Sequence, residues 1–451
     1  MLLAHGIGGV RDLPVPDWLF FYGAGAVLVV SFAALAALWR EPLLERGRRG
    51  RPLPAALQRL WGSPFLRVAL SASSLALLVL VFLASLLGER SAQENLAPTF
   101  VWVVFWLGLV PLAVLLGDVW SVLNPWRAGA DAVTWAWRAL GRQYQPPFSY
   151  PERLGRYPAT VLLLSFATLE LAYSQPSDPR ALALAIFLYS AITWAGMALF
   201  GRRAWLDNGE AFTSYFGILA LLSPLAANEG RLVVRWPLVG LATPARRPGT
   251  TAFLAVMLGS VLFDGFSRTT FWQDRFYRVQ VELIERPSLA ELAGILLNLL
   301  GLLLAVAVVG LAFVAAVRAA SLLGGGEGML EGAFVHSLVP IALVYAIAHY
   351  FSLFVLQGQA AIRLASDPFG RGWDLFGSAS FTPDLGLLTP NTIWYVQVGA
   401  LVAGHVAGLA VAHDRAVSLF RSPRLAAASQ YPMLVLMVAY TVAGLWVLSQ
   451  G

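Results

Sequence analysis

Long apolar runs, separated by shorter polar stretches, dominate this chain. Ten of these runs have the length of a transmembrane helix, because about 20 largely apolar residues cross the hydrocarbon core of a bilayer. They cover residues 18–39, 65–87, 99–118, 157–175, 180–200, 251–267, 289–317, 333–357, 392–412 and 431–449. The pattern predicts an all-α fold, a polytopic transmembrane helical bundle of about 10 spans, with the whole chain, 1–451, as one integral membrane domain.

The polar stretches contain shorter amphipathic elements. Residues 124–141 open with Asn-Pro and carry Trp at helical spacing, which predicts an interfacial helix on the membrane surface. The aromatic spacing of 271–286 predicts a second interfacial helix, and 207–226 predicts a half-buried one. Asn228-Glu229-Gly230 predicts a turn between two short strands. The connecting loops are 119–156 and 201–250 on one side of the membrane, and 268–288 and 358–391 on the other.

Arginine is distributed unevenly between the two sides. Of the 31 basic residues, all Arg, seven lie in 40–67, five in 119–156, six in 201–250 and four in the other two loops of the same side. This majority side should be cytoplasmic, because positively charged loops stay inside. Ten spans then place both termini outside a bacterial plasma membrane. The four residues before His5 are too few for a signal peptide, unless a longer precursor is cleaved to leave His5 at the mature N-terminus.

Composition narrows the class of protein further. Hydrophobic residues make up 58% and charged residues 12%, which excludes a disordered chain and an ordinary soluble enzyme. The absence of Cys excludes disulfides, thiolate metal sites and a Cys nucleophile. The net charge of +6 follows from topology, so it predicts no nucleic-acid partner. The expected partners are the lipid bilayer and a hydrophobic small molecule.

Three ionisable residues inside the predicted spans are the main catalytic candidates. At about 1.5 Å per residue, Glu170, Asp264 and His349 all fall in the outer half of the membrane. Buried charges in a membrane are costly and mark functional sites. We expect the three to converge in a polar pocket open to the outside, as an acid–base set or a metal site. Tyr350 could add a hydrogen bond, as could Gln357 and Gln359; local bonding of each residue is the alternative.

The other histidines supply cofactor hypotheses. His336 and His349 lie 13 residues apart, a spacing that resembles a helix of a di-haem cytochrome. His405 and His413 are only 8 apart and do not match it, so the haem hypothesis is a single haem between His336 and His405. The candidate ligands of a divalent metal are His349, His405, His413, Asp264 and His5. His413-Asp414-Arg415 ends a span, where an ion pair at the membrane boundary is the alternative to a catalytic role.

Five stretches together resemble a family of bacterial polytopic membrane proteins, common in actinobacteria, that often carries the label fenitrothion hydrolase. They are AHGIGGVRDLPVPDWLF (4–20), GDVWSVLNPWR (117–127), VLFDGFS (261–267), SLVPIALVYAIAHYFSLFVLQGQ (337–359) and GHVAGLAVAHDRA (404–416). The resemblance runs over nearly the whole chain. It implies hydrolysis of an organophosphorus triester, and it implies no catalytic residues.

Three functions therefore compete. A membrane hydrolase would attack a hydrophobic phosphotriester at the site of His349 and Asp264, with or without a metal. A secondary transporter or permease would use the same buried residues as a relay. A redox or assembly subunit would bind haem or copper, with His5 as an external copper ligand.

Overall fold

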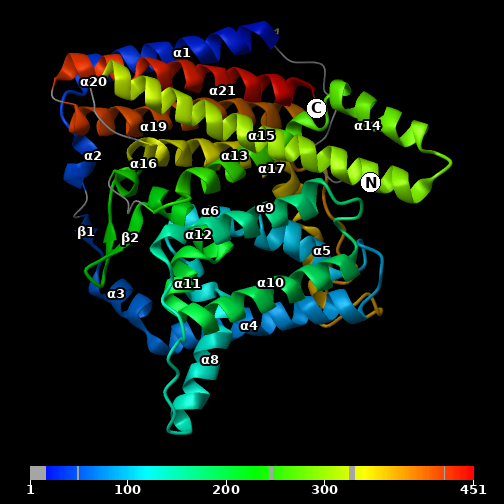
Figure 1. The fold of residues 1–451 in the computed structure, drawn as a ribbon. Helices are drawn as coiled ribbons and strands as arrows, with labels where there is room; N and C mark the ends of the chain where they lie inside the picture. The colour runs from blue at the N-terminus through cyan, green and yellow to red at the C-terminus, as the bar shows by residue number, and fades with distance from the viewer. Residues whose placement is uncertain (1–16, 48–49, 243–246, 325–330, 421, 451) are drawn as a thin grey trace.

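A computed structural model describes residues 17–47, 50–242, 247–324, 331–420 and 422–450. Over these residues the protein is an all-α membrane-type bundle, as predicted, with one small β-sheet (Figure 1). Its long helices form two groups that pack against each other through α9 and α13. One group comes mainly from the second half of the chain, and the other comes from the first half.

The first group combines the N-terminal helix with the C-terminal half of the chain. Although α1 is first in the sequence, it packs against α21 and α19 at the edge of this group. The closest pair is α17 and α19, where a Cβ atom added to Gly404 would lie 2.1 Å from Val344 Cγ2. Small residues allow such close approach between membrane helices. The group consists of α1 (Asp17–Leu38), α13 (Thr250–Phe266), α15 (Pro287–Leu323), α17 (Leu338–Gln357), α19 (Pro390–Leu419) and α21 (Tyr431–Gln450).

The second group surrounds a cluster of aromatic rings. Phe212 is central to it and packs against Phe105, Phe166 and Trp126. One of its spans contains a π-helical segment, in which the amide of Trp106 donates to the carbonyl of Val101. The group consists of α4 (Pro64–Leu87), α5 (Leu96–Thr99), η2 (Phe100–Phe105), α6 (Leu109–Leu116), α9 (Tyr157–Leu171), α10 (Pro179–Phe200), α12 (Ala211–Leu219) and η4 (Ala220–Leu222).

Each of the ten predicted spans is helical, although not all are long enough to span by themselves. Among the described residues, seven helices are long and apolar enough to cross a membrane. An eighth span is possible if α13 is counted together with α14 (Thr270–Glu282), from which it is bent by 76°. The other two predicted spans are α1, which has 22 residues and contains the apolar stretch Tyr22–Leu38, and α9, which has only 15 residues. The expected count of about 10 is therefore approximate.

The arginine-rich loops gather at one end of the bundle, on the left in Figure 1. There, α8 has Asn124 as its N-cap, whose side chain accepts from the amide of Arg127, and the helix runs across the bundle axis. The predicted turn is also present: Glu229 and Gly230 have positive φ between two strands. The elements of these loops are α2 (Leu43–Arg46), α3 (Ala55–Gly62), α7 (Trp120–Leu123), α8 (Pro125–Ala139), η3 (Glu152–Leu154), α11 (Arg202–Asn208), η5 (Val239–Leu241), α16 (Glu331–Phe334), η6 (Val335–Ser337) and α20 (Pro423–Ser429).

The sheet joins two of these loops. It is antiparallel with the strand order β1-β3-β2, from β1 (Arg51–Pro52), β2 (Leu225–Asn228) and β3 (Arg231–Val234). At the opposite end of the bundle lies α14, the predicted second interfacial helix. The loop after α18 (Ala360–Ser366) is ordered by its own polar groups: buried Ser366 accepts from the amides of Phe376 and Ser378.

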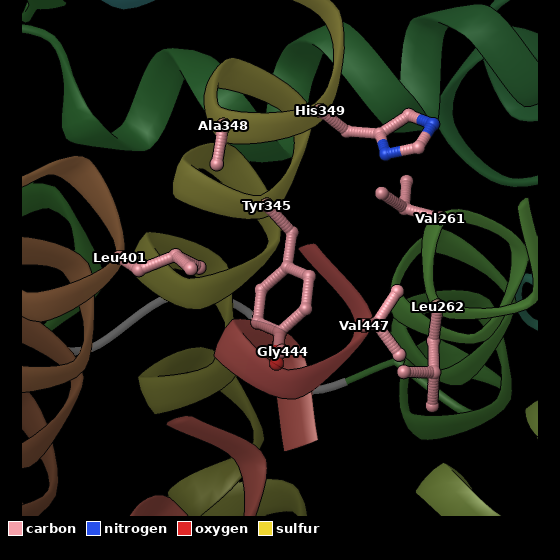
Figure 2. A pocket seen from close by; sticks show the side chains of 8 residues that line it. All are labelled: Val261, Leu262, Tyr345, Ala348, His349, Leu401, Gly444 and Val447. Carbon is pink, nitrogen blue, oxygen red and sulfur yellow. The ribbon is translucent and has the colours of Figure 1, made fainter. Parts of the chain in front are cut away.

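The packing of α13, α17, α19 and α21 leaves a cavity of about 20 Å³ (Figure 2). Its lining is apolar except for His349 and Tyr345. A cavity of this size holds about one water molecule. The cavity therefore places a water-sized space beside one of the candidate catalytic residues.

Candidate functional site

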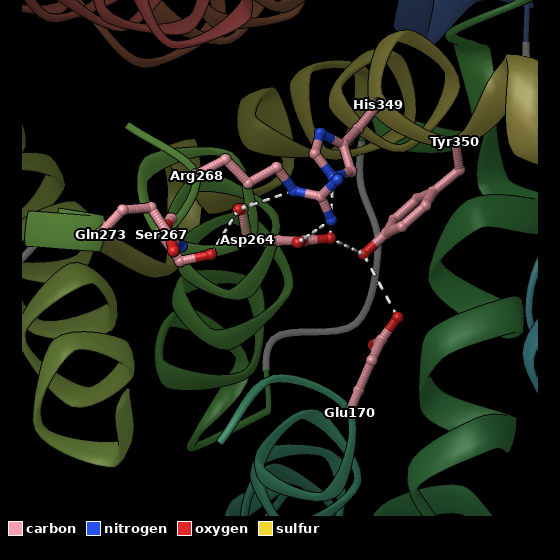
Figure 3. Close-up of polar contacts among 7 residues, drawn as sticks. All are labelled: Glu170, Asp264, Ser267, Arg268, Gln273, His349 and Tyr350. Atoms are coloured by element: carbon pink, nitrogen blue, oxygen red, sulfur yellow. Dashed lines mark hydrogen bonds and ion pairs between the residues drawn. The ribbon is translucent and has the colours of Figure 1, made fainter. Parts of the chain in front are cut away.

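The structure brings the three main candidates together. Glu170 on α9, Asp264 on α13 and His349 on α17 are joined by Tyr350, the neighbour of His349 (Figure 3). α9 and α13 run in the same direction and both start at the arginine-rich end, so positions near their C-termini reach the same depth. The site therefore lies toward the end of the bundle that carries α14.

Asp264 is the centre of the site, and its side chain is only 3% exposed. Its Oδ1 accepts from Arg268 Nη2 at 2.8 Å. Its Oδ2 accepts from Tyr350 Oη at 3.0 Å and lies 2.7 Å from His349 Nε2. Charged and multiple donors offset the cost of a carboxylate buried away from water. The described partners of Asp264 thus favour an ionised carboxylate.

Arg268 reaches Asp264 across the C-terminal end of α13, because side chains four residues apart are neighbours on a helical turn. Asp264 and Arg268 are four residues apart, and the α13 helix ends at Phe266, between them. The backbone carbonyl of Asp264 accepts from Ser267 Oγ at 2.8 Å, and Gln273 Nε2 donates to the carbonyl of Ser267 at 2.6 Å. These contacts hold the turn between α13 and α14, so the turn positions the positive charge of Arg268.

Glu170 meets the network through Tyr350, whose hydroxyl lies 3.5 Å from Glu170 Oε1. A tyrosine hydroxyl has one proton, and here the shorter contact is to Asp264. Both contacts are hydrogen bonds at once only when Glu170 carries a proton and donates it to the Tyr350 oxygen. The order Glu170, Tyr350, Asp264, His349 is therefore a chain along which a proton can be passed.

His349 presents its two ring nitrogens to different surroundings. Nε2 faces Asp264, and Nδ1 lies on the side of the cavity (Figure 2). Donation from Nε2–H to Asp264 fixes the tautomer in which Nδ1 carries a lone pair. The arrangement can take a proton from a water molecule in the cavity.

The other candidate histidines do not join this site. His405 is fully buried, with Nδ1 bonded to the Leu401 carbonyl at 2.7 Å and its ring against Tyr345. His336 lies in η6, before α17 begins, and His5 lies outside the described residues. In the described parts of the chain, no group of three or more His, Asp or Glu side chains could hold a metal ion. The five predicted metal ligands therefore do not form one described cluster.

His413, Asp414 and Arg415 connect α19 to the segment after α1. Asp414 Oδ1 accepts from Trp39 Nε1 and from the Leu44 amide, both at 3.0 Å. His413 Nε2 lies 2.8 Å from the Trp39 carbonyl, and Arg415 pairs with Glu45 at 3.3 Å. The ion pair of this segment is therefore between Arg415 and Glu45, whereas these two donors to Asp414 are neutral. This cluster anchors the connection between α1 and α2.

Two charged residues with clear structural roles, Arg268 and Glu210, were not predicted from the sequence. Arg268 lies one residue beyond the expected span 251–267, and only its spacing of four from Asp264 could have indicated it. Glu210 is fully buried at the N-cap of α12, where it accepts from the amides of Phe212 and Thr213 and from Asn124. Its position just before an apolar helical run is typical of an N-cap. Glu210 is satisfied by neutral donors, so a role in holding α12 against α8 explains its burial.

Comparisons with known proteins add no assignment. No family model, no curated protein and no solved structure matches the chain. The function must therefore be argued from the site itself.

Proposed function

We propose that this integral membrane protein is a hydrolase of lipophilic esters, with organophosphorus triesters as the substrate class. The observation that carries the proposal is the orientation of His349, with Nε2 held 2.7 Å from Asp264 and Nδ1 beside a water-sized cavity. A carboxylate that orients a histidine toward a nucleophile is a recurring arrangement for general-base catalysis. The resemblance noted in the sequence gives the substrate class.

The chemistry follows from these positions. A water oxygen attacks phosphorus while His349 Nδ1 takes one of the water protons, and the bond to the aryloxide leaving group breaks. The products are a dialkyl phosphate and a phenolate, and the imidazolium returns its proton to the phenolate or to water. Asp264 stabilises the imidazolium through Oδ2, and Arg268 donates to Oδ1 of the same carboxylate. The cavity has room for the attacking water alone, so the proposal requires the substrate to reach this water from the bilayer.

Proton-coupled transport is the second candidate, and a different observation favours it. The contact between Glu170 and Tyr350 links α9, in one helix group, to α17 in the other. A movement between the two groups would break or form this contact, and would thereby couple protonation of Glu170 to the movement. In that case the same side chains would move protons without cleaving a bond.

The position in the membrane is part of the proposal. We place the arginine-rich end in the cytoplasm of a bacterial cell and the site of Asp264 and His349 toward the outside, with both termini outside. The distribution of Arg between the two sets of loops supports this orientation.

One experiment separates the two functions. The full chain in proteoliposomes is given a nitrophenyl phosphotriester, and release of nitrophenolate is followed by absorbance. We expect His349→Gln and Asp264→Asn to reduce the rate by about 10²- to 10⁴-fold, the usual contribution of a general base. Asp274→Asn, an exposed acid-to-amide change on α14, is the matched control and should retain the rate.

Each negative result of this experiment decides between the two functions. Equal rates in the wild type and in both site variants would overturn the hydrolytic role of His349. If the wild type releases no nitrophenolate but changes the internal pH of the liposomes, and Glu170→Gln abolishes that change, the transport function is supported instead. Elemental analysis of the same samples tests whether a metal accompanies either activity.

A further inference from the structure

A second polar site lies at the opposite end of the same two helices. α9 and α13 start side by side at the arginine-rich end, and their N-cap residues are Arg156 and Gly249. The Arg156 amide donates to the Pro248 carbonyl at 2.7 Å, and a Cβ atom added to Gly249 would lie 2.8 Å from the Tyr157 nitrogen. The first turns of both helices are therefore in contact.

This contact concentrates positive charge. The amides in the first turn of a helix have no acceptor within the helix, and the helix dipole adds about half a unit of positive charge there. Parallel packing of α9 and α13 places two such ends together. Gly249, with φ of 79°, allows the approach because it lacks a side chain.

Two arginines increase this charge further. Arg156 Nη1 donates to Thr250 Oγ1 at 3.3 Å, and the Arg156 Nε is buried without a hydrogen-bond partner. Among the described residues, the acceptors of Arg247 are two neutral oxygens, the Asp207 carbonyl and Asn208 Oδ1. Within the described segments, neither guanidinium has a carboxylate within ion-pair distance, and the Asp207 carboxylate faces Arg203 instead.

The pKa of Arg156 is consistent with a positive charge that nearby carboxylates do not balance. Burial and the nearby charge of Arg247 lower the pKa of Arg156 from its ordinary value to about 10, against a smaller opposing effect of Asp207. Two half-buried like charges beside two positive helix ends destabilise the folded protein unless an anion is present. An oxyanion at this position would accept from the two guanidinium groups and from first-turn amides other than those of Arg156 and Thr250, which already donate to the Pro248 and Arg247 carbonyls.

We propose that Arg156 and Arg247, beside the N-termini of α9 and α13, form a binding site for a phosphate-type oxyanion, here named the Arg156 site; Gly249 allows the two helix ends to approach, and Thr250 positions Arg156. The phosphate belongs either to the headgroup of an anionic phospholipid or to phosphate in solution. The site lies where the spans begin at the arginine-rich end, the depth at which phospholipid phosphates occur. It is independent of the hydrolytic function proposed for His349.

The test uses the purified full chain and its tryptophan fluorescence on heating. Sodium phosphate is titrated against sodium chloride at equal ionic strength, and phosphatidylglycerol is titrated against phosphatidylcholine in mixed micelles. A ligand that binds only the folded state raises the Tm with its concentration. We expect the wild type to respond, and Arg156→Gln and Arg247→Gln each to weaken the apparent affinity by at least about tenfold, which is about 1.4 kcal/mol.

The control is Arg153→Gln, which removes an exposed arginine from the same loop and should respond like the wild type. Arg156→Lys keeps the charge without the planar fork and should bind with intermediate affinity, which also guards against misfolding of Arg156→Gln. A response to phosphatidylglycerol alone assigns the site to a lipid headgroup, and a response to both ligands assigns it to the phosphate anion itself. Equal responses of the wild type, Arg156→Gln and Arg247→Gln, or no response of the wild type, would overturn the proposal.

Discussion

His349 Nε2 lies 2.7 Å from Asp264 Oδ2, across the contact between α17 and α13. The same carboxylate binds Arg268 and Tyr350, so one buried acid holds together two helices and the turn that follows one of them. This arrangement has consequences for stability that can be measured without knowledge of the substrate.

Removing one partner from this network should lower the free energy of unfolding, and the loss should be larger when charged groups remain unpaired. Asp264→Leu leaves Arg268 and His349 without their acceptor, and we expect a loss of about 3–5 kcal/mol, as for other broken buried pairs. Tyr350→Phe removes one hydroxyl donor and should cost about 1 kcal/mol. Thermal unfolding in detergent measures both, and a larger loss for Tyr350→Phe than for Asp264→Leu would contradict Asp264 as the centre.

Sequence reasoning located the site through depth along the spans. Glu170, Asp264 and His349 converge because helices rise at a constant rate, so their positions relative to the span ends indicate a common depth. The same arithmetic could not exclude His405, because depth gives no information about which face of a helix is turned toward a neighbour. His405 instead bonds to its own helix and packs against Tyr345.

Contacts made by loops and turns could not be predicted from the depth of residues along the spans. Arg268 lies beyond the predicted span, after α13 ends at Phe266, and a hydropathy pattern does not indicate that such a side chain returns to a carboxylate four residues before it. The hydrogen bond from the Leu44 amide to Asp414 joins residues 370 positions apart. Every residue except proline has such an amide, so the sequence does not indicate which one is the donor. By contrast, the helix of 125–139 and the turn at Glu229-Gly230 were predictable because capping and turn chemistry is local.

Two glycines on α19 should respond in opposite directions to the same substitution. The Cβ atom of Gly404→Ala would lie 2.1 Å from Val344 Cγ2, so α17 and α19 must separate, at a cost of about 1–3 kcal/mol. Gly399 has no neighbour within 4 Å, so Gly399→Ala should stabilise the helix by up to about 1 kcal/mol. Thermal unfolding of the two variants tests the pair, and similar shifts would contradict the close helix contact.

The proposed orientation can be tested by cysteine labelling, because the chain contains no native Cys. Gln143→Cys introduces a thiol in the exposed segment after α8, and Thr382→Cys introduces one in the loop before α19. In intact cells, a membrane-impermeant maleimide should label Thr382→Cys only. After the cells are broken open, it should label both. Labelling of Gln143→Cys in intact cells would reverse the orientation.

The lowered pKa of Arg156 predicts a dependence of stability on pH in chloride buffer, where the Arg156 site has no phosphate ligand. Because burial and Arg247 lower the pKa of Arg156 to about 10 in the folded state, the unfolded chain binds more protons than the folded chain above that pH. This residue's contribution to stability therefore rises with pH above about 10, and its full destabilising effect is present below.

The Tm difference between Arg156→Gln and the wild type should be constant from pH 7 to about 9, and should shift in favour of the wild type above about pH 10. The contributions of groups that titrate alike in both proteins cancel in this Tm difference. The Tm difference between Arg153→Gln and the wild type should stay constant over the same pH range. A flat profile for Arg156→Gln as well would show that the charge of Arg156 is not destabilised by its surroundings.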